Sequence, residues 1–152
     1  MIPLQNDKTI QLFHAASATA AGTVTSTYVD ASGYEYAEFI VLAATAGTTG
    51  AIPASVAIQH SDTTNTSDFA TISGASATTS TTGYITALPT TAGTVPIARV
   101  GVNLLGKKRY LRLALTGPAA NSCTVSAAVA LSRASQSPTG TNVGASVAVN
   151  VG

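Results

Sequence analysis

The sequence predicts an all-β protein: an antiparallel β-sandwich of about eight strands with extended N- and C-terminal arms. Short segments of alternating apolar and polar residues recur along its 152 residues, and turn-forming residues separate them every ~8–12 residues. No segment has the 3.6-residue apolar stripe of an ordinary helix. Because Ala, Thr, Ser and Gly dominate the chain, closely packed sheets are expected, and a jelly roll is the favoured arrangement.

The first half of the chain is expected to supply an arm and five strands. Residues 1–8 form the arm because Pro3 blocks regular pairing. The first, third and fourth strands alternate, the second is rich in β-branched Thr and Val, and the fifth is a short apolar segment after the polar turn 61–68. The expected strands are 9–18, 22–29, 34–42, 54–60 and 69–72.

The second half begins with residues 74–93, which are expected to form a long surface excursion with one short strand at 84–89. Three alternating strands are expected after it: 95–102, 109–116 and 123–132. The second of these has the clearest alternation, with Arg112 on one face and three leucines on the core face (Leu111, Leu113, Leu115). A turn follows it, so strand 123–132 is expected to pair antiparallel with strand 109–116.

The sandwich domain is expected to span residues 9–132, and residues 133–152 are expected to form a C-terminal linker and arm. Residues 135–140 are rich in Ser, Pro and Gly, which is typical of a linker. The alternating valines that follow indicate a strand that pairs with a sheet edge of another chain (Val143, Val147, Val149, Val151).

Charge is sparse but unevenly distributed. Only 9% of the residues are charged and the net charge is +1, which excludes general attraction to nucleic acid. All six acids precede residue 69, whereas six of the seven cations follow residue 98. Complementary pairing between strands or between copies is therefore expected. Arg112 and Glu38, each on the more polar face of its strand, are expected to contact an opposite charge across a sheet or subunit boundary. With neither a signal-type leader nor a long apolar segment, the chain is expected to be neither secreted by that route nor membrane-spanning.

No catalytic, cofactor or metal site is expected. His14, His60 and Cys123 are too far apart for zinc-type spacing, and a lone cysteine allows no intramolecular disulfide. Glu35 and Glu38 fall on opposite faces of their strand, so they cannot flank one glycosidic bond as acid and base. The glycines show no phosphate-binding pattern and no serine lies in a nucleophile elbow. The protein is expected not to be an enzyme and to have no small-molecule substrate.

Two polar segments have alternative interpretations. Asp62, Asn65 and Asp68 could offer oxygen ligands to calcium, but their spacing departs from an EF-hand loop, and a capped turn is favoured. The cluster 107–109, Lys-Lys-Arg, could contact phosphate, form a solvated loop or dock on an acidic surface of another subunit.

Two segments resemble small jelly-roll structural proteins of tailed bacteriophages. In the first, residues 56–69, an apolar-x-apolar-Gln-x-Ser-Asp strand leads into a Thr-rich turn and Phe69. In the second, residues 106–112, Lys-Arg-Tyr-x-Arg opens a core strand, and a Ser-Gly-Tyr before Glu35 fits the same pattern. The resemblance covers residues 33–132. Discoidin-like carbohydrate-binding jelly rolls share the Ser-Asp turn and the Arg-Tyr-x-Arg strand, but here Trp is absent and the tyrosines are dispersed along the chain.

The phage resemblance implies a capsid decoration, or cement, protein. Such a protein would bind the major capsid protein lattice on the capsid exterior, stabilise the head and form homotrimers, after assembly in the host cytoplasm. A tail or connector component is the alternative within this class. The residues expected at interfaces are Glu35, Glu38, Lys107, Lys108, Arg109, Arg112, Val143, Val147, Val149 and Val151.

Overall fold

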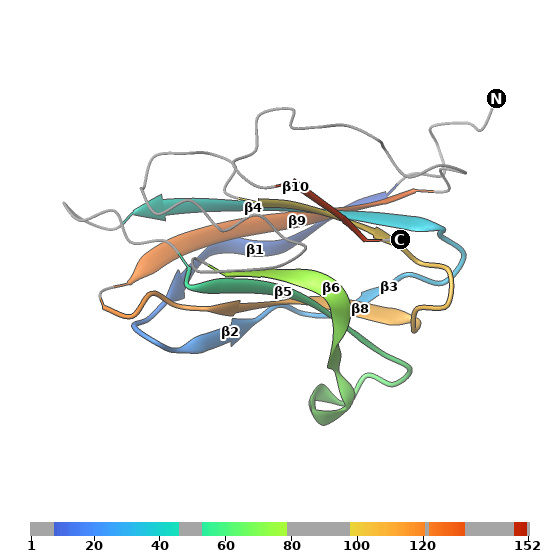
Figure 1. Cartoon of the computed structure of the whole chain (residues 1–152), viewed down its shortest axis with the longest axis horizontal. Coiled ribbons are helices and arrows are strands. Elements are labelled where there is room, and N and C mark those ends of the chain that lie inside the picture. Colours follow the sequence, from blue (N-terminus) through green and yellow to red (C-terminus); the bar gives the residue numbers. More distant parts are fainter. Residues whose placement is uncertain (1–7, 46–52, 79–97, 121, 133–147, 152) are drawn as a thin grey trace.

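The structure, a computed structural model, describes residues 8–45, 53–78, 98–120, 122–132 and 148–151. Its strands are β1 (Lys8–Ala18), β2 (Thr23–Thr25), β3 (Val29–Asp30), β4 (Tyr36–Thr45), β5 (Ser55–Ser61), β6 (Ala70–Thr78), β7 (Ala98–Asn103), β8 (Tyr110–Thr116), β9 (Cys123–Ser132) and β10 (Ala148–Val151). They form two sheets packed face to face (Figure 1), which confirms the predicted all-β sandwich. No helix in these ranges is long and apolar enough to cross a membrane.

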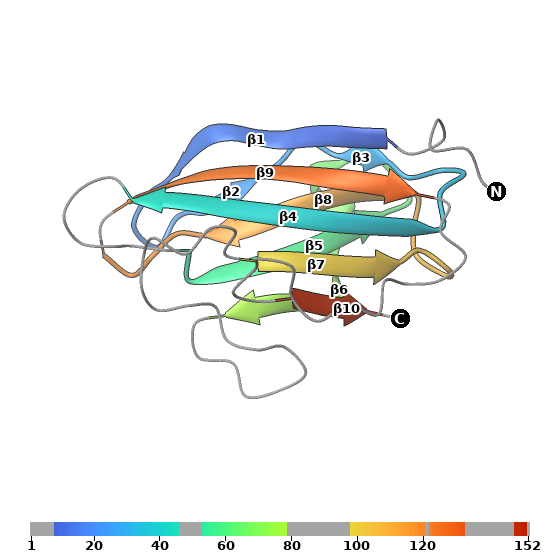
Figure 2. The same ribbon diagram turned by 90° about the horizontal axis from the view of Figure 1, so that it is seen from above.

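The strand pairing is that of a jelly roll. β1 pairs with β9, β2 and β3 with β8, β4 with β7, and β5 with β6, all antiparallel. These pairs are divided between two sheets. Sheet A has the strand order β1-β9-β4-β7-β10, and sheet B has the order β2-β8-β5-β6, with β3 also beside β8. Figure 2 shows the order of sheet A from above. The described residues form ten strands rather than about eight, because the second expected strand is divided in two and β10 is added.

Ser26 lies where the second expected strand is divided into β2 and β3. Its backbone N–H donates to the Leu113 carbonyl over 2.8 Å, and the Leu113 N–H donates to the Ser26 hydroxyl over 2.9 Å. A side-chain oxygen thus replaces a backbone carbonyl in the ladder with β8. The buried polar groups remain satisfied even though regular pairing stops.

The expected hairpin between strands 109–116 and 123–132 is wrong. β8 pairs with β2, β3 and β5 in sheet B, whereas β9 pairs with β1 and β4 in sheet A. The connection through Gly117 and Pro118 therefore carries the chain from one sheet to the other. Alternation reports which face of a strand is buried but not which strand lies beside it, and this connection exceeds a two-residue hairpin turn.

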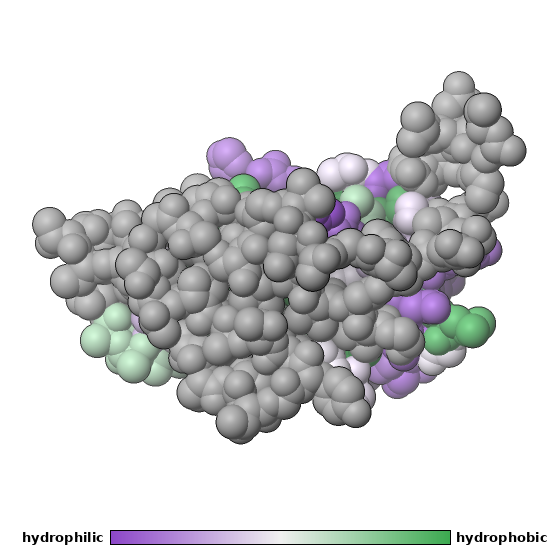
Figure 3. Space-filling model, turned by 45° about the horizontal axis from the view of Figure 1, so that its top comes forward, coloured by the Kyte–Doolittle hydropathy of each residue, from purple (hydrophilic) through white to green (hydrophobic). Residues whose placement is uncertain are grey.

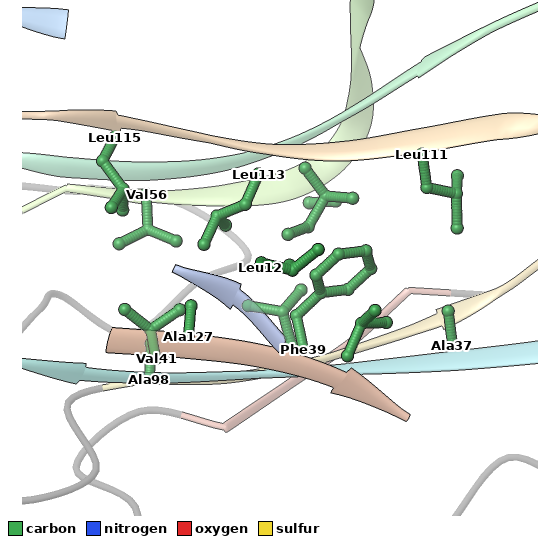
Figure 4. Close-up of a cluster of buried hydrophobic side chains, with 14 of the residues drawn as sticks. Leu12, Ala37, Phe39, Val41, Val56, Ala98, Leu111, Leu113, Leu115 and Ala127 are labelled. Atoms are coloured by element: carbon green, nitrogen blue, oxygen red, sulfur yellow. The ribbon is translucent and has the colours of Figure 1, made fainter. Parts of the chain in front are cut away.

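The core lies between the sheets and is built from the inward residues of both (Figure 4). Leu111, Leu113 and Leu115 point from sheet B toward sheet A, as predicted, and all are buried. In β1 the prediction was incomplete, because Leu12 and Phe13 are both buried although they are consecutive. Register shifts on either side of Phe13 explain this, since a bulge re-aims a side chain that would otherwise face water.

The strand expected at 69–72 begins at Ala70 and continues to Thr78. Gly74 has φ 80°, and the pairing with β5 shifts register nearby. This left-handed conformation suits glycine and allows a bulge that extends the strand into its small-residue segment. The short strand expected at 84–89 lies outside the described residues.

The C-terminal strand β10 pairs parallel with β7 of its own chain, from Ala148 opposite Arg99 to Val151 opposite Val102. It therefore occupies an edge of sheet A. The sequence predicts that this segment pairs with a sheet edge of another chain, and such pairing between chains stays a prediction. Of the predicted arm residues, Val143 and Val147 lie outside the described residues, as do residues 1–7 of the N-terminal arm.

Candidate functional site

The candidate site lies at the end of the sandwich where β8 begins. Two connections and one edge strand meet there: the β7–β8 loop (104–109), the β5–β6 turn (62–69) and β3. Figure 1 shows the β5–β6 turn projecting from the sandwich. In Figure 3 the coloured residues at the right-hand end are mostly hydrophilic, with one strongly hydrophobic group among them. The fold thus brings together residues that are far apart in sequence, such as Asp30 and Arg109, which are 79 positions apart.

The β7–β8 loop is shaped by local hydrogen bonds. The Lys107 N–H donates to the Leu104 carbonyl and the Leu105 N–H to the Asn103 side-chain oxygen, both over 2.9 Å. Gly106, with φ 71°, supplies the left-handed residue of this turn. The loop thereby presents Leu105 to solvent with 85% of its surface exposed.

Arg112 is buried on the outer face of sheet B, with only 8% of its surface exposed. Its guanidinium lies 4.2 Å from the centre of the Phe69 ring, and its Nε donates to Gln59 Oε1 over 2.7 Å. Burial lowers the pKa of Arg112. The expected contact between Arg112 and an opposite charge is not found in the described part of the chain, because an aromatic ring and a neutral amide take that place.

Arg109 forms a two-pronged ion pair with Asp30 of β3. Its Nε and Nη2 donate to the two carboxylate oxygens over 3.0 and 2.6 Å, and the Ser32 N–H also donates to Asp30 over 3.0 Å. The Arg109 hydrogen bond is the main cause that lowers the pKa of Asp30. Both side chains are about half exposed, so the pair fixes geometry more than it stabilises the fold.

Tyr28 and Tyr110 form an aromatic pair beside this ion pair. Their ring centres lie 5.4 Å apart at an interplanar angle of 76°, and the Arg109 guanidinium lies 5.1 Å from the Tyr110 ring. Tyr28 is 48% exposed. The dispersal of the tyrosines along the sequence is therefore no argument against a carbohydrate site, because folding brings two of them together. Tyr28 was missed as a site residue, since its position next to Tyr110 depends on the pairing of β3 with β8.

The lysines of the loop have different surroundings. Lys108 Nζ lies 3.4 Å from the Asp62 carboxylate, and both side chains are well exposed. Lys107 has no ion pair among the described residues. With Lys108 and Arg109 paired to acids of the same chain, a dedicated phosphate site is disfavoured, and a structured polar loop is favoured.

Glu38 meets an opposite charge across sheet A, as predicted. Its partner is Arg99 on the adjacent strand β7, and both side chains are about three-quarters buried. Glu35 is exposed just before β4, and its carbonyl accepts the Leu104 N–H over 2.9 Å. Glu35 thus borders the candidate site, whereas Glu38 lies on the other sheet.

The turn around Asp68 has its own internal partners. The Thr63 and Ser67 hydroxyls and the Asn65 amide all donate to the Asp68 carboxylate, which lowers its pKa. These contacts favour the capped-turn interpretation over a calcium loop. The described residues contain no group of three or more His, Cys, Asp or Glu placed to hold a metal. No protein-family model matches the chain, and no curated protein matches it.

Proposed function

We propose that this chain is a non-enzymatic viral structural protein, a decoration protein that binds the major capsid protein lattice on the capsid exterior and stabilises the head. The observation that carries the proposal links the two segments that resemble phage proteins. Gln59 and Phe69 belong to the first segment and Arg112 to the second, and the Arg112 side chain contacts both of the others, Gln59 across the β5–β8 pairing and Phe69 at the end of the β5–β6 turn. The shared motif therefore corresponds to one packing unit of the jelly roll, which explains why its parts occur together.

The aromatic pair is the proposed contact with the major capsid protein. Tyr and Arg are enriched among the residues that dominate the binding energy of protein interfaces. Tyr28 is half exposed and its ring packs edge to face with Tyr110, which in turn contacts the Arg109 guanidinium of the ion pair with Asp30. Little conformational entropy would be lost on binding such a prearranged surface.

A homotrimer is part of the proposal. Only 9% of the residues are charged, and three ion pairs take up six of the charges on the described residues, so much of the surface carries small neutral side chains. Permanent interfaces of this kind often exceed ~2,000 Å². Light scattering behind size exclusion should give three copies, and a clean monomer would contradict this part of the proposal.

Binding to undecorated capsids tests the function itself. Tyr28→Ala should weaken binding by about 30-fold, as expected for a hot-spot residue. Thr25→Ala on the adjoining edge strand is the matched control and should bind as the native chain does, because it removes an exposed side chain without an aromatic ring. If the native chain does not bind capsids, the decoration function is wrong. If the native chain binds and Tyr28→Ala binds equally well, the contact lies elsewhere.

Carbohydrate binding is the second candidate, favoured by the same aromatic pair. An exposed aromatic ring beside fixed polar groups is the arrangement that sugar sites use. Titration with glycans, followed by the NMR signals of Tyr28 and Tyr110, would separate the two. Saturable shifts with a sugar and no capsid binding would favour the second candidate.

A further inference from the structure

One hydrogen bond connects the middle of the β7–β8 loop to β5. The backbone N–H of Lys108 donates to Nδ1 of His60 over 3.2 Å. Nδ1 accepts only through its lone pair, so the proton of the neutral ring must lie on Nε2. A doubly protonated imidazolium has no acceptor, and the contact cannot survive protonation.

The charges around His60 oppose its protonation. Lys108 and Lys107 face it from the loop, Asp62 faces it from the β5–β6 turn, and its cross-strand partners on β8 and β6, Leu111 and Ala70, are uncharged. Burial is the main cause that lowers the pKa of His60, and the two lysines lower it further, whereas Asp62 opposes them. The ring is therefore neutral near pH 7.

We propose that His60 is an acid-sensitive latch: in its neutral form it holds the β7–β8 loop against β5, and on protonation it releases the loop around Lys107 and Lys108. The release is local. The carbonyl of Arg109 accepts the Ala31 N–H over 2.9 Å and its side chain holds Asp30, so the end of the loop has separate anchors. Acidification would thus rearrange the part of the loop around Lys107 and Lys108 while its end at Arg109 stays in place. The latch goes beyond the proposed function and is tested on the free protein.

The sign of the pH dependence follows from the lowered pKa. An unfolded histidine titrates at about 6.5, and folding lowers the value, so between the two the unfolded chain binds the proton more strongly. Stability should therefore be complete above pH 6.5, fall as the pH drops through that value, and stop falling below the folded pKa.

NMR of the full chain at pH 4.5 to 8 tests the latch. The His60 ring should titrate below 6.5, and protection of the Lys108 amide from hydrogen exchange should fall by at least about tenfold with the same midpoint. His60→Asn places an acceptor that does not titrate near the position of Nδ1 and should keep the protection at all these pH values, whereas the control His14→Asn should behave as the native chain does. Constant protection while His60 titrates would overturn the latch, as would titration at or above 6.5. If His60→Asn does not fold, the native titration and exchange still decide.

Discussion

Replacing Arg112 with alanine should destabilise the folded chain itself. The substitution removes a hydrogen bond from a charged group to Gln59, a kind of bond that contributes about 1.5–3 kcal/mol. It also removes the cation–π contact with Phe69, worth about 0.5–2 kcal/mol depending on desolvation. Gln59 is only partly buried and can regain water, so the lower ends of these ranges apply. The expected loss is about 2–3 kcal/mol in the free energy of unfolding.

Urea unfolding followed by far-ultraviolet circular dichroism measures this loss. Arg109→Ala is a matched control, because it removes the same side chain three residues earlier from an exposed ion pair and should change stability far less. Arg112→Lys should fall between Arg112→Ala and the native chain, since it keeps the charge but loses the planar stack. Native stability in Arg112→Ala together with lost oligomerisation would refute this reasoning and restore the interface role that the sequence predicts.

Three further substitutions or treatments have expected outcomes. Gly117→Ala should lower the unfolding free energy by about 2–4 kcal/mol, because its new Cβ would lie 1.9 Å from the Thr19 carbonyl oxygen. In the control Gly106→Ala the new Cβ meets nothing within 4 Å, so the loss should be only about 1–2 kcal/mol, caused by the φ of 71°. Equal losses of the two variants in urea unfolding would contradict the clash at Gly117. The Cys123 thiol is buried, which raises its pKa, so it should resist a thiol reagent until the chain unfolds; rapid native labelling would place it elsewhere. Truncation after Arg133 should leave a β-rich circular dichroism spectrum, because β10 is an edge strand; loss of that spectrum would make it part of the core.

The alternation of the sequence was sufficient to predict the fold class. Leu111, Leu113 and Leu115 are buried because a two-residue period on a strand defines one face. The same logic failed at β1, where a bulge places Leu12 and Phe13 together in the core. The position of a bulge depends on the strand that lies alongside, and the alternation pattern of a strand does not indicate which strand that is.

The candidate site was predicted in part. The basic cluster and its acidic counterparts could be identified from their uneven distribution, and the pairs of Glu38 with Arg99 and of Asp30 with Arg109 follow that pattern. The burial of Arg112 could not be predicted, because the polar face of a strand is normally expected to face solvent. In the structure the β5–β6 turn places Phe69 over the Arg112 side chain. The contact between Tyr28 and Tyr110 likewise required the jelly-roll pairing of β3 with β8.

A cryo-EM map of the intact particle that carries this protein tests the proposed function most directly. The proposal predicts density for the sandwich on the outside of the capsid lattice, in groups of three, with the end that carries Tyr28 and Tyr110 against the major capsid protein. Density for the sandwich in the tail or connector, or a capsid exterior without it, would contradict the proposal.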